Sequence, residues 1–163
     1  MQELVIGLGS NLGDRRKNIE SAIALIGEKI GLVTAVSSLV ETEPWGFESE
    51  NKFLNCAITV SIMYTESAAV SLVLRGIIGI LQSIEHEYGR VRTGVYTDRV
   101  IDLDILFYGD VVINEPGLTV PHPKLHEREF VLVSLMELCP EKVHPGMGKS
   151  IREVTGEKLS NLK

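Results

Sequence analysis

Hydrophobic positions change their spacing from one segment of the chain to the next, and these spacings predict the secondary structure. Short runs rich in β-branched residues predict strands, in which alternate side chains face opposite sides. Apolar positions that recur at helical spacing predict amphipathic helices. By these criteria we expect strands at residues 4–8, 32–40, 53–64 and 100–108, and helices at residues 14–31, 68–87 and 128–138.

Capping and turn-forming residues mark the boundaries between these elements. Asp14 and Ser67 carry side chains that can cap the first two helices. The segment 42–52 combines Pro, Gly and charged residues, which is typical of a loop. A Gly-Asp pair directly after residue 108 predicts a hairpin into a strand at residues 111–114. The C-terminal part of the chain favours short helices and turns.

The order of the expected elements predicts the fold class. Strand, helix, strand, strand, helix and strand follow one another, which is the order of a split βαβ, or ferredoxin-like, arrangement. We therefore expect an α+β fold with an antiparallel sheet, helices packed on one face, and C-terminal helical additions. The length of 163 residues and the lack of an obvious linker predict a single domain over residues 1–163.

Composition excludes several classes of protein. The formal net charge is −6 at pH 7, which argues against a protein that binds nucleic acid or an anionic membrane surface. An acidic protein that binds an anion must concentrate its positive charge in one place. No apolar run is long enough for a membrane span, and no signal-peptide pattern follows Met1. We therefore expect a cytoplasmic protein, with a monomer as the default.

The segment GRVRTGVYTDRVIDLDILF at residues 89–107 places three arginines directly before an apolar strand that carries two aspartates. Asp102 and Asp104 are two positions apart, so they point to the same face of the strand. Neighbouring carboxylates repel each other, and a magnesium ion offsets that repulsion. Guanidinium groups match phosphate oxygens, so this segment predicts a site for a magnesium-bound nucleotide. The alternative is an acidic strand face beside an unrelated basic turn.

Two further motifs hint at a dinucleotide-binding loop and a zinc site, and neither interpretation is supported. The glycines of GLGSNLGD at residues 7–14 are out of register with the dinucleotide-binding pattern G-x-G-x-x-G, and the chain holds no P-loop motif. These glycines more simply predict a tight turn from a strand into a helix. His122 and His126 hint at a zinc pair, but the prolines around His122 disfavour a helix there and no HExxH glutamate accompanies them.

Several motifs together resemble one enzyme family. They are GLGSNLGD at 7–14, TEPWG at 42–46, FLN at 53–55, QSIEHEYGRVR at 82–92, R-x-x-DLDIL at 99–106 and LTVPHPKLHEREFVL at 118–132. Any one of these fragments could arise by chance, whereas all of them in this order could hardly do so. The chain resembles the 6-hydroxymethyl-7,8-dihydropterin pyrophosphokinase family over nearly its whole length.

The resemblance implies an ATP-dependent pyrophosphokinase of folate biosynthesis. Such an enzyme transfers the β,γ-pyrophosphoryl group of ATP to the hydroxymethyl oxygen of 6-hydroxymethyl-7,8-dihydropterin and releases AMP. The implied cofactor is Mg²⁺, as two ions that Asp102 and Asp104 hold against the phosphates. The catalytic residues implied by the matching motifs are Arg90, Arg92, Arg99, Asp102 and Asp104.

The resemblance also implies where the two substrates bind. The residues expected to contact ATP are Gln82, Glu85, Arg92, Tyr96, Arg99, His122 and Arg128. Those expected to contact the pterin are Thr42, Trp45, Phe53, Asn55, Asp102 and Phe130. Phe53 and Phe130 match a pair of rings that sandwich the pterin, and Asn55 matches the side chain that binds its polar edge. Outside this family, the two phenylalanines would be read as core residues.

Residues 96–99 depart from the family pattern. The chain has Tyr-Thr-Asp-Arg there instead of a Trp-Gly-Pro-Arg-like run. We expect Tyr96 to cover the site, and we expect Asp98 to place a negative charge near the phosphates, which would weaken ATP binding or slow closure of the 89–99 loop. That loop contains two glycines and three arginines that repel one another, so it is expected to close only over a bound nucleotide.

The sequence leaves two other functions open. One is a non-catalytic ferredoxin-like module that binds nucleotides or regulates another protein. The other is a different magnesium-dependent phosphoryl or nucleotidyl transferase on the same scaffold. The released product separates them, because pyrophosphoryl transfer yields AMP, a simple kinase yields ADP, and a nucleotidyl transferase yields pyrophosphate. No residue is indicated as a general base.

Overall fold

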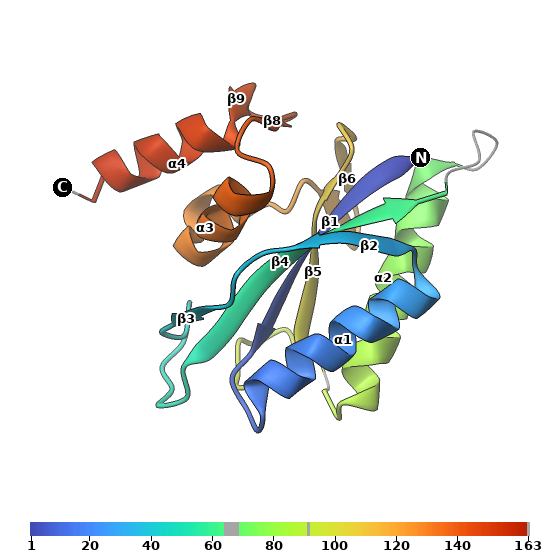
Figure 1. The fold of residues 1–163 in the computed structure, drawn as a ribbon, viewed down its shortest axis with the longest axis vertical. Coiled ribbons are helices and arrows are strands. Elements are labelled where there is room, and N and C mark those ends of the chain that lie inside the picture. Colours follow the sequence, from blue (N-terminus) through green and yellow to red (C-terminus); the bar gives the residue numbers. More distant parts are fainter. Residues whose placement is uncertain (64–68, 91, 163) are drawn as a thin grey trace.

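The computed structural model describes residues 1–63, 69–90 and 92–162. Its centre is an antiparallel sheet with the strand order β2-β4-β1-β5, in which β3 also pairs with β4 (Figure 1). The strands are β1 (Gln2–Ser10), β2 (Leu32–Val36), β3 (Val40–Thr42), β4 (Phe53–Ile62) and β5 (Asp102–Tyr108). β1 lies in the middle and pairs with β4 on one side and with β5 on the other.

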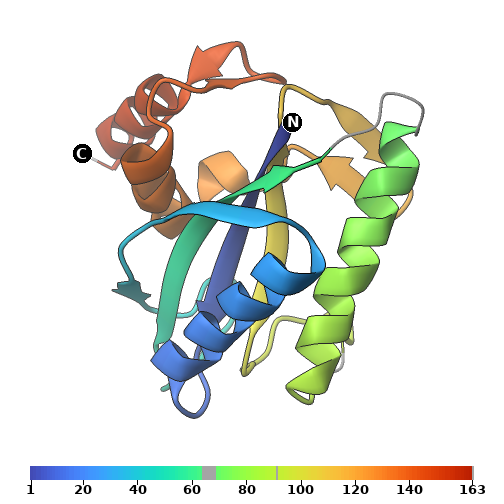
Figure 2. The same ribbon diagram turned by 45° about the vertical axis from the view of Figure 1, so that its right-hand side comes forward.

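Helices α1 (Arg15–Lys29) and α2 (Val70–Glu87) cover one face of this sheet, and α3 (Glu129–Leu138), with α4 (Ile151–Ser160) packed against it, lies on the other face (Figure 2). Alternation along β1 creates the two faces, because Leu4 and Ile6 join the core under α1 and α2 while Val5 joins the core under α3 and α4. The sheet is therefore buried on both sides.

The expected fold class is confirmed. The strands and helices of the first 108 residues follow the predicted order, and the sheet is antiparallel. The C-terminal helical additions are α3 and α4. The expectation that helices pack on one face of the sheet holds only for α1 and α2. The C-terminal additions pack on the other face and supply a second core from Val131, Leu135 and Ile151. Asp14 caps α1 as expected, since its side chain accepts a hydrogen bond from the backbone N–H of Lys17.

The strand expected at residues 32–40 is divided into β2 and β3. Ser37 lies at the break, where its hydroxyl accepts the hydrogen bond that the backbone N–H of Ala57 would otherwise give to a carbonyl. The next residue, Ser38, donates hydrogen bonds from its backbone N–H and its hydroxyl to Glu137 of α3. A serine side chain that competes with backbone pairing explains the interruption.

The prediction of a hairpin directly after strand 100–108 is wrong. Residues 113–115 form β6 (Ile113–Glu115), which pairs with β7 (Leu118–Val120) and not with β5. The turn between β6 and β7 contains Pro116 and Gly117, and Gly117 has a φ of 73°. A Pro-Gly pair with a left-handed glycine is a stronger hairpin signal than the Gly-Asp pair that suggested the other pairing.

The remaining elements are short. A 3-10 helix, η1 (Leu125–Glu127), precedes α3, and β8 (Val143–His144) pairs with β9 (Lys149–Ser150) before α4. The hairpin β8–β9 was not expected from the sequence. Ser67, the expected cap of the second helix, lies outside the described residues, and α2 has Ala69 at its N-cap without a side-chain hydrogen bond. None of the helices in the described ranges is long and apolar enough to cross a membrane.

Candidate active site

Strands β4, β1 and β5 present alternate residues on the face that carries α3, and these residues form the floor of a cavity. In the register of the sheet, Gly9 of β1 lies between Asn55 of β4 and Asp102 of β5, and Gly7 lies beside Asp104. Glycine leaves open space where other residues of a strand carry a side chain. A Cβ atom on Gly9 would lie 2.8 Å from Oδ1 of Asn55. Gly9 therefore makes room for the Asn55 amide.

Asp102 and Asp104 lie on β5, at the edge of the sheet, and each has arginine partners. Oδ1 of Asp102 accepts a hydrogen bond from Nη1 of Arg90, and its Oδ2 lies 3.6 Å from Nη1 of Arg99. Oδ2 of Asp104 lies 3.4 Å from Nη1 of Arg128. The prediction that the two aspartates share one face of the strand is confirmed, and their pairing with arginines is a finding of the structure.

Glu85 of α2 is the side chain that anchors two of these arginines. The residue is only 1% exposed. Its Oε1 accepts from Nη1 of Arg90 at 2.7 Å, from Nη2 of Arg92 at 2.8 Å and from the backbone N–H of Leu103 at 2.9 Å. Its Oε2 accepts from Nε of Arg92 at 2.8 Å. A contact between Glu85 and ATP stays a prediction, and in this structure its carboxylate instead positions the arginines.

The environment separates the pKa values of the two aspartates. Burial and the neighbouring charge of Asp102 raise the pKa of Asp104 to about 6. Burial also disfavours ionisation of Asp102, but the charges of Arg99 and Arg90 outweigh it and hold the pKa of Asp102 below its usual range. Asp102 therefore loses its proton first as the pH rises, and Asp104, which ionises second, carries the cost of the second negative charge.

Asp104→Asn should make the free protein more stable at neutral pH. A carboxyl group whose pKa is raised on folding binds its proton more tightly in the folded state, so Asp104 destabilises the fold increasingly as the pH rises from about 4 to about 6. Removing that charge should add about 1–3 kcal/mol to the free energy of unfolding at pH 7.5. Urea denaturation in the presence of a chelator measures it.

Urea denaturation of the same proteins over a range of pH provides the control for this prediction. The gain of Asp104→Asn should shrink towards zero below pH 4, where both proteins carry an uncharged group at this position. Asp102→Asn should have the opposite sign at pH 7.5, because it removes the carboxylate that pairs with Arg99 and one of the two that pair with Arg90. Equal losses for both variants would show that like-charge repulsion does not act between the aspartates.

His122 lies beside the acidic pair and is uncharged. Its Nε2 is 3.8 Å from Oδ2 of Asp104. Burial, followed by the charge of Arg128, lowers the pKa of His122 to about 4. Its Nδ1 accepts a hydrogen bond from the backbone N–H of Lys124, and this leaves the proton of the neutral ring on Nε2. His122 can therefore donate one hydrogen bond into the cavity, and a phosphate oxygen could accept it.

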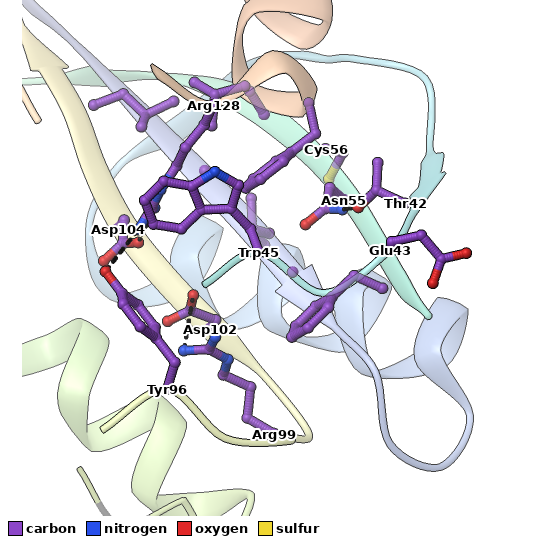
Figure 3. Close-up of a pocket in the computed structure, with 18 residues that line it drawn as sticks. Thr42, Glu43, Trp45, Asn55, Cys56, Tyr96, Arg99, Asp102, Asp104 and Arg128 are labelled. Carbon is purple, nitrogen blue, oxygen red and sulfur yellow. Dashed lines mark hydrogen bonds and ion pairs between the residues drawn. The ribbon is translucent and has the colours of Figure 1, made fainter. Parts of the chain in front are cut away.

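The cavity above Gly9 contains all the side chains expected to contact the pterin. Its lining includes Thr42, Trp45, Phe53, Asn55, Asp102 and Phe130. Nδ2 of Asn55 donates to Oγ1 of Thr42 at 2.7 Å, which fixes the orientation of the amide. The free volume is about 50 Å³, because the side chain of Trp45 lies across the cavity (Figure 3). A bicyclic ring therefore requires Trp45 to move.

Trp45 and Tyr96 close the cavity together. Their rings meet edge to face, with centroids 5.8 Å apart, and Tyr96 packs on Gly46. The guanidinium carbon of Arg128 lies 4.8 Å from the centre of the Trp45 ring, and Nη2 of Arg128 contacts the Tyr96 hydroxyl at 3.4 Å. Tyr96 thus covers the site as expected. Lys124, which the sequence did not indicate, places Nζ 5.1 Å from the Trp45 ring centre.

Two further cavities include Asp104 in their lining, and Phe53 lines neither of them. One, of about 240 Å³, is lined by Arg90, Arg92, Tyr96, Arg99, Asp102, Asp104, His122, Pro123, Lys124 and Arg128. The other, of about 270 Å³, includes Gln82 of α2, Thr119 of β7 and the side chains of Arg92 and His122. The residues expected at ATP are therefore gathered beside Asp104, and only Glu85 lies behind this surface. Cationic side chains outnumber carboxylates here, although the whole chain is acidic.

Asp98 is bound to the end of β1 and to the loop before β4. Its carboxylate is held by Asn11 and Asn51, and it is not among the residues that line the arginine-rich cavity. Hydrogen bonds from Ser49, with further ones from Asn51 and Asn11, keep the pKa of Asp98 below its usual range. A charge of Asp98 beside the phosphates stays a prediction, and in this structure its carboxylate is engaged by Asn11 and by the loop before β4.

The acidic pair suits a hard divalent cation held jointly with phosphate. In the described part of the chain no group of three His, Cys, Asp or Glu side chains is arranged to hold a metal ion. Magnesium usually takes one or two carboxylates and completes its shell with water and phosphate oxygens. The raised pKa of Asp104 marks a position where a cation would relieve repulsion. Asp102 and Asp104 therefore fit magnesium bound together with a nucleotide.

Comparison with known proteins places the chain among pterin enzymes. Residues 5–140 match the family described as 7,8-dihydro-6-hydroxymethylpterin-pyrophosphokinase (HPPK). A 2-amino-4-hydroxy-6-hydroxymethyldihydropteridine pyrophosphokinase of Porphyromonas gingivalis is 37% identical over 149 residues, which cover 89% of this chain and 95% of that one. The folic acid synthesis protein fol1 of Schizosaccharomyces pombe is 39% identical over 91% of this chain and 19% of its own length.

Solved structures agree on the fold. An HPPK-DHPS protein crystallised in complex with substrates superimposes with a TM-score of 0.74 at 16% identity. The match covers 99% of this chain and 44% of that chain, so this chain spans less than half of the larger protein. At such low identity the likeness concerns the fold, and the sequence relatives carry the assignment to a family.

Proposed function

The chain belongs to the 7,8-dihydro-6-hydroxymethylpterin-pyrophosphokinase family, and on this premise we propose how its site performs the reaction. The enzyme transfers the pyrophosphoryl group of ATP to the hydroxymethyl oxygen of 6-hydroxymethyl-7,8-dihydropterin and releases AMP, a step of folate biosynthesis. The observation that best supports a role for this site is the position of Asp102 and Asp104, which line both the aromatic cavity and the arginine-rich cavity. A group that passes between two substrates must cross such a boundary.

The aromatic cavity is proposed to bind the pterin. Phe53 and Phe130 offer ring faces and edges to a flat heteroaromatic ring, and Asn55 and Thr42 offer fixed polar groups to its rim. Phe53 is 6% exposed and Asn55 is equally buried, so neither needs to be desolvated further when the ring enters. The hydroxymethyl group would then point towards Asp102 and Asp104.

The arginine-rich cavity is proposed to bind the phosphates of ATP, with Gln82 and Thr119 nearer to the nucleoside. Arg92, Arg99 and Arg128 can fork onto phosphate oxygens, and His122 can donate from Nε2. We further propose that Asp102 and Asp104 hold two magnesium ions, which neutralise charge on the transferred group when bound. The contribution of the arginines is to orient the pyrophosphoryl group and to stabilise its charge in a site without free water.

Closure of the site is proposed to exclude water from this transfer. Trp45 comes from the loop before β4 and Tyr96 from the segment before β5, and their contact covers the junction of the two cavities. Water that reached the β-phosphorus would hydrolyse ATP without transfer. A cytoplasmic location, a monomeric state and a single domain over residues 1–163 stay predictions.

Product analysis tests the proposed function directly. The protein is incubated with ATP, magnesium and the pterin alcohol, and the released nucleotide is separated and quantified. AMP formed in equal amounts with the pyrophosphorylated pterin is the expected result. Release of ADP or of pyrophosphate would instead indicate a simple kinase or a nucleotidyl transferase. A failure to bind a non-hydrolysable ATP analogue with magnesium would favour a non-catalytic module.

Replacing either phenylalanine should weaken the binding of the pterin selectively. Phe53→Ala and Phe130→Ala should each cost about 1–3 kcal/mol of pterin binding, through lost stacking and apolar contact. The affinity for an ATP analogue should change much less, because neither ring lines the arginine-rich cavity. Titration calorimetry with both ligands measures this. Equal losses for the two ligands would mean that the rings only support the fold.

A further inference from the structure

Asp98 joins two segments that are far apart in the sequence. Its Oδ1 accepts a hydrogen bond from Nδ2 of Asn11 at 2.7 Å, and its Oδ2 accepts one from Nδ2 of Asn51 at 2.7 Å. Asn11 directly follows β1, and Asn51 lies in the loop before β4. Each oxygen of the carboxylate thus serves a different segment.

The partner Asn11 is itself fully engaged and only 3% exposed. Its Oδ1 accepts from the backbone N–H of Arg99 at 2.7 Å, and its own backbone N–H donates to the carbonyl of Arg99 at 3.1 Å. Its Nδ2 also donates to the carbonyl of Asn51 at 3.1 Å. Asn11 therefore fixes the backbone at Arg99 to the end of β1, and Asp98 extends this network to the Asn51 side chain.

The segments that meet at Asp98 carry side chains of both cavities. Arg99 places its guanidinium carbon 5.3 Å from the centre of the Phe53 ring and also pairs with Asp102. The loop that contains Asn51 also carries Trp45, which covers the aromatic cavity and contacts Tyr96. A shift of one segment relative to the other would separate these groups.

A carboxylate is the side chain that this junction requires. Two amide groups direct N–H donors at the same point from opposite segments. A carboxylate accepts from both, whereas an amide in the same place accepts with one end and presents donors at the other. Hydrogen bonds to a charged acceptor are also the stronger kind.

We propose that Asp98 is a positioning residue: by binding Asn11 and Asn51 at once, its carboxylate holds Arg99 and the 43–52 loop in place over the two substrates as one unit. The identity of those substrates rests on the proposed function, whereas the junction itself does not. The first test therefore uses the free protein, and turnover is measured separately.

Amide hydrogen exchange of the free protein tests the junction. Asp98→Ala should lower the protection of amides in residues 47–52 and at Arg99 by about tenfold or more, as expected for the loss of hydrogen bonds to a charged group. Glu48→Ala, which removes an exposed carboxylate from the same loop, is the matched control and should leave protection unchanged. Unchanged protection in Asp98→Ala would overturn the proposal.

Exchanging the side chains at positions 98 and 51 tests whether the two residues pair directly or whether the charge of Asp98 acts in a general way. Asp98→Asn should lose the contact with Asn51, because two amide donors then face each other, and Asn51→Asp should bring two carboxylates together. The double variant Asp98→Asn with Asn51→Asp restores a donor and an acceptor, since the new amide can still accept from Asn11. Recovery of protection in the double variant is expected. A double variant no better than the worse single variant would contradict a direct pairing.

Kinetics then tests the positioning role. Asp98→Ala should lower kcat/KM for the pterin by about ten- to a hundredfold, and the double variant should regain most of it. The affinity for an ATP analogue alone should also fall, because Arg99, which Asp98 holds in place, lines the arginine-rich cavity. Normal kcat/KM despite lost protection would overturn the positioning role. Absence of AMP release by the unaltered protein would instead refute the proposed function and leave the exchange result standing.

Discussion

Asp102→Asn and Asp104→Asn should each lower the rate of AMP release by about a thousandfold or more, the range expected when a ligand of the catalytic magnesium is lost. Each carboxylate lies at the boundary between the two cavities, where the pyrophosphoryl group must pass. An amide keeps the size of the side chain but supplies less negative charge to a cation. Turnover at saturating magnesium and both substrates measures the effect.

The stability of the same variants separates chemistry from folding. Asp104→Asn is expected to be more stable than the unaltered protein at pH 7.5, so a loss of activity in that variant cannot come from unfolding. Asp110→Asn is a suitable control, because the Asp110 side chain is 91% exposed and lies at the far end of β5. Retention of a tenth of the normal rate in either site variant would contradict a metal-binding role for that residue.

Glu85→Ala should destabilise the protein by about 3–5 kcal/mol, because it removes the carboxylate that two arginines share and leaves their charges poorly compensated. Glu85 is 1% exposed and also accepts a hydrogen bond from the backbone N–H of Leu103, which lies between the two aspartates on β5. Its loss therefore disturbs the positions of Arg90 and Arg92 together with the strand that carries the acidic pair. Urea denaturation at pH 7.5 measures the change.

A surface glutamate of the same helix provides the comparison. Glu87 pairs with Lys29 at 2.9 Å, and both side chains are well exposed, so Glu87→Ala should cost less than about 1 kcal/mol. Glu85→Gln should fall between the two, since an amide accepts with only one of its ends. A loss below about 1 kcal/mol for Glu85→Ala would mean that the arginines do not depend on it.

Several features of the site followed from sequence because they depend on local spacing. Residues two apart in a strand share a face whatever the rest of the chain does, so the spacing of Asp102 and Asp104 was sufficient to place both on one side of β5. The same rule gives Phe53 and Asn55 a common face on β4. Helical periodicity located α1 and α2 in the same way. The family motifs then supplied the roles that spacing could not.

Other expectations failed where a distant residue decided the outcome. Ser37 interrupted a predicted strand because its hydroxyl meets the backbone of Ala57 on a neighbouring strand. The hairpin after β5 was assigned to the wrong partner because the stronger turn, at Pro116 and Gly117, lies further along the chain. In each case a local propensity competed with a contact or turn outside the segment under consideration.

The sequence by itself determined which side chains share a face, where the positive charge gathers and which family the motifs resemble. Only the tertiary structure decided that Glu85 anchors Arg90 and Arg92, that Asp98 binds Asn11 and Asn51, and that Gly9 makes room for Asn55. The physical reason is that covalent spacing fixes direction within one element, whereas hydrogen bonds, pKa values and close approaches depend on the register and packing between elements.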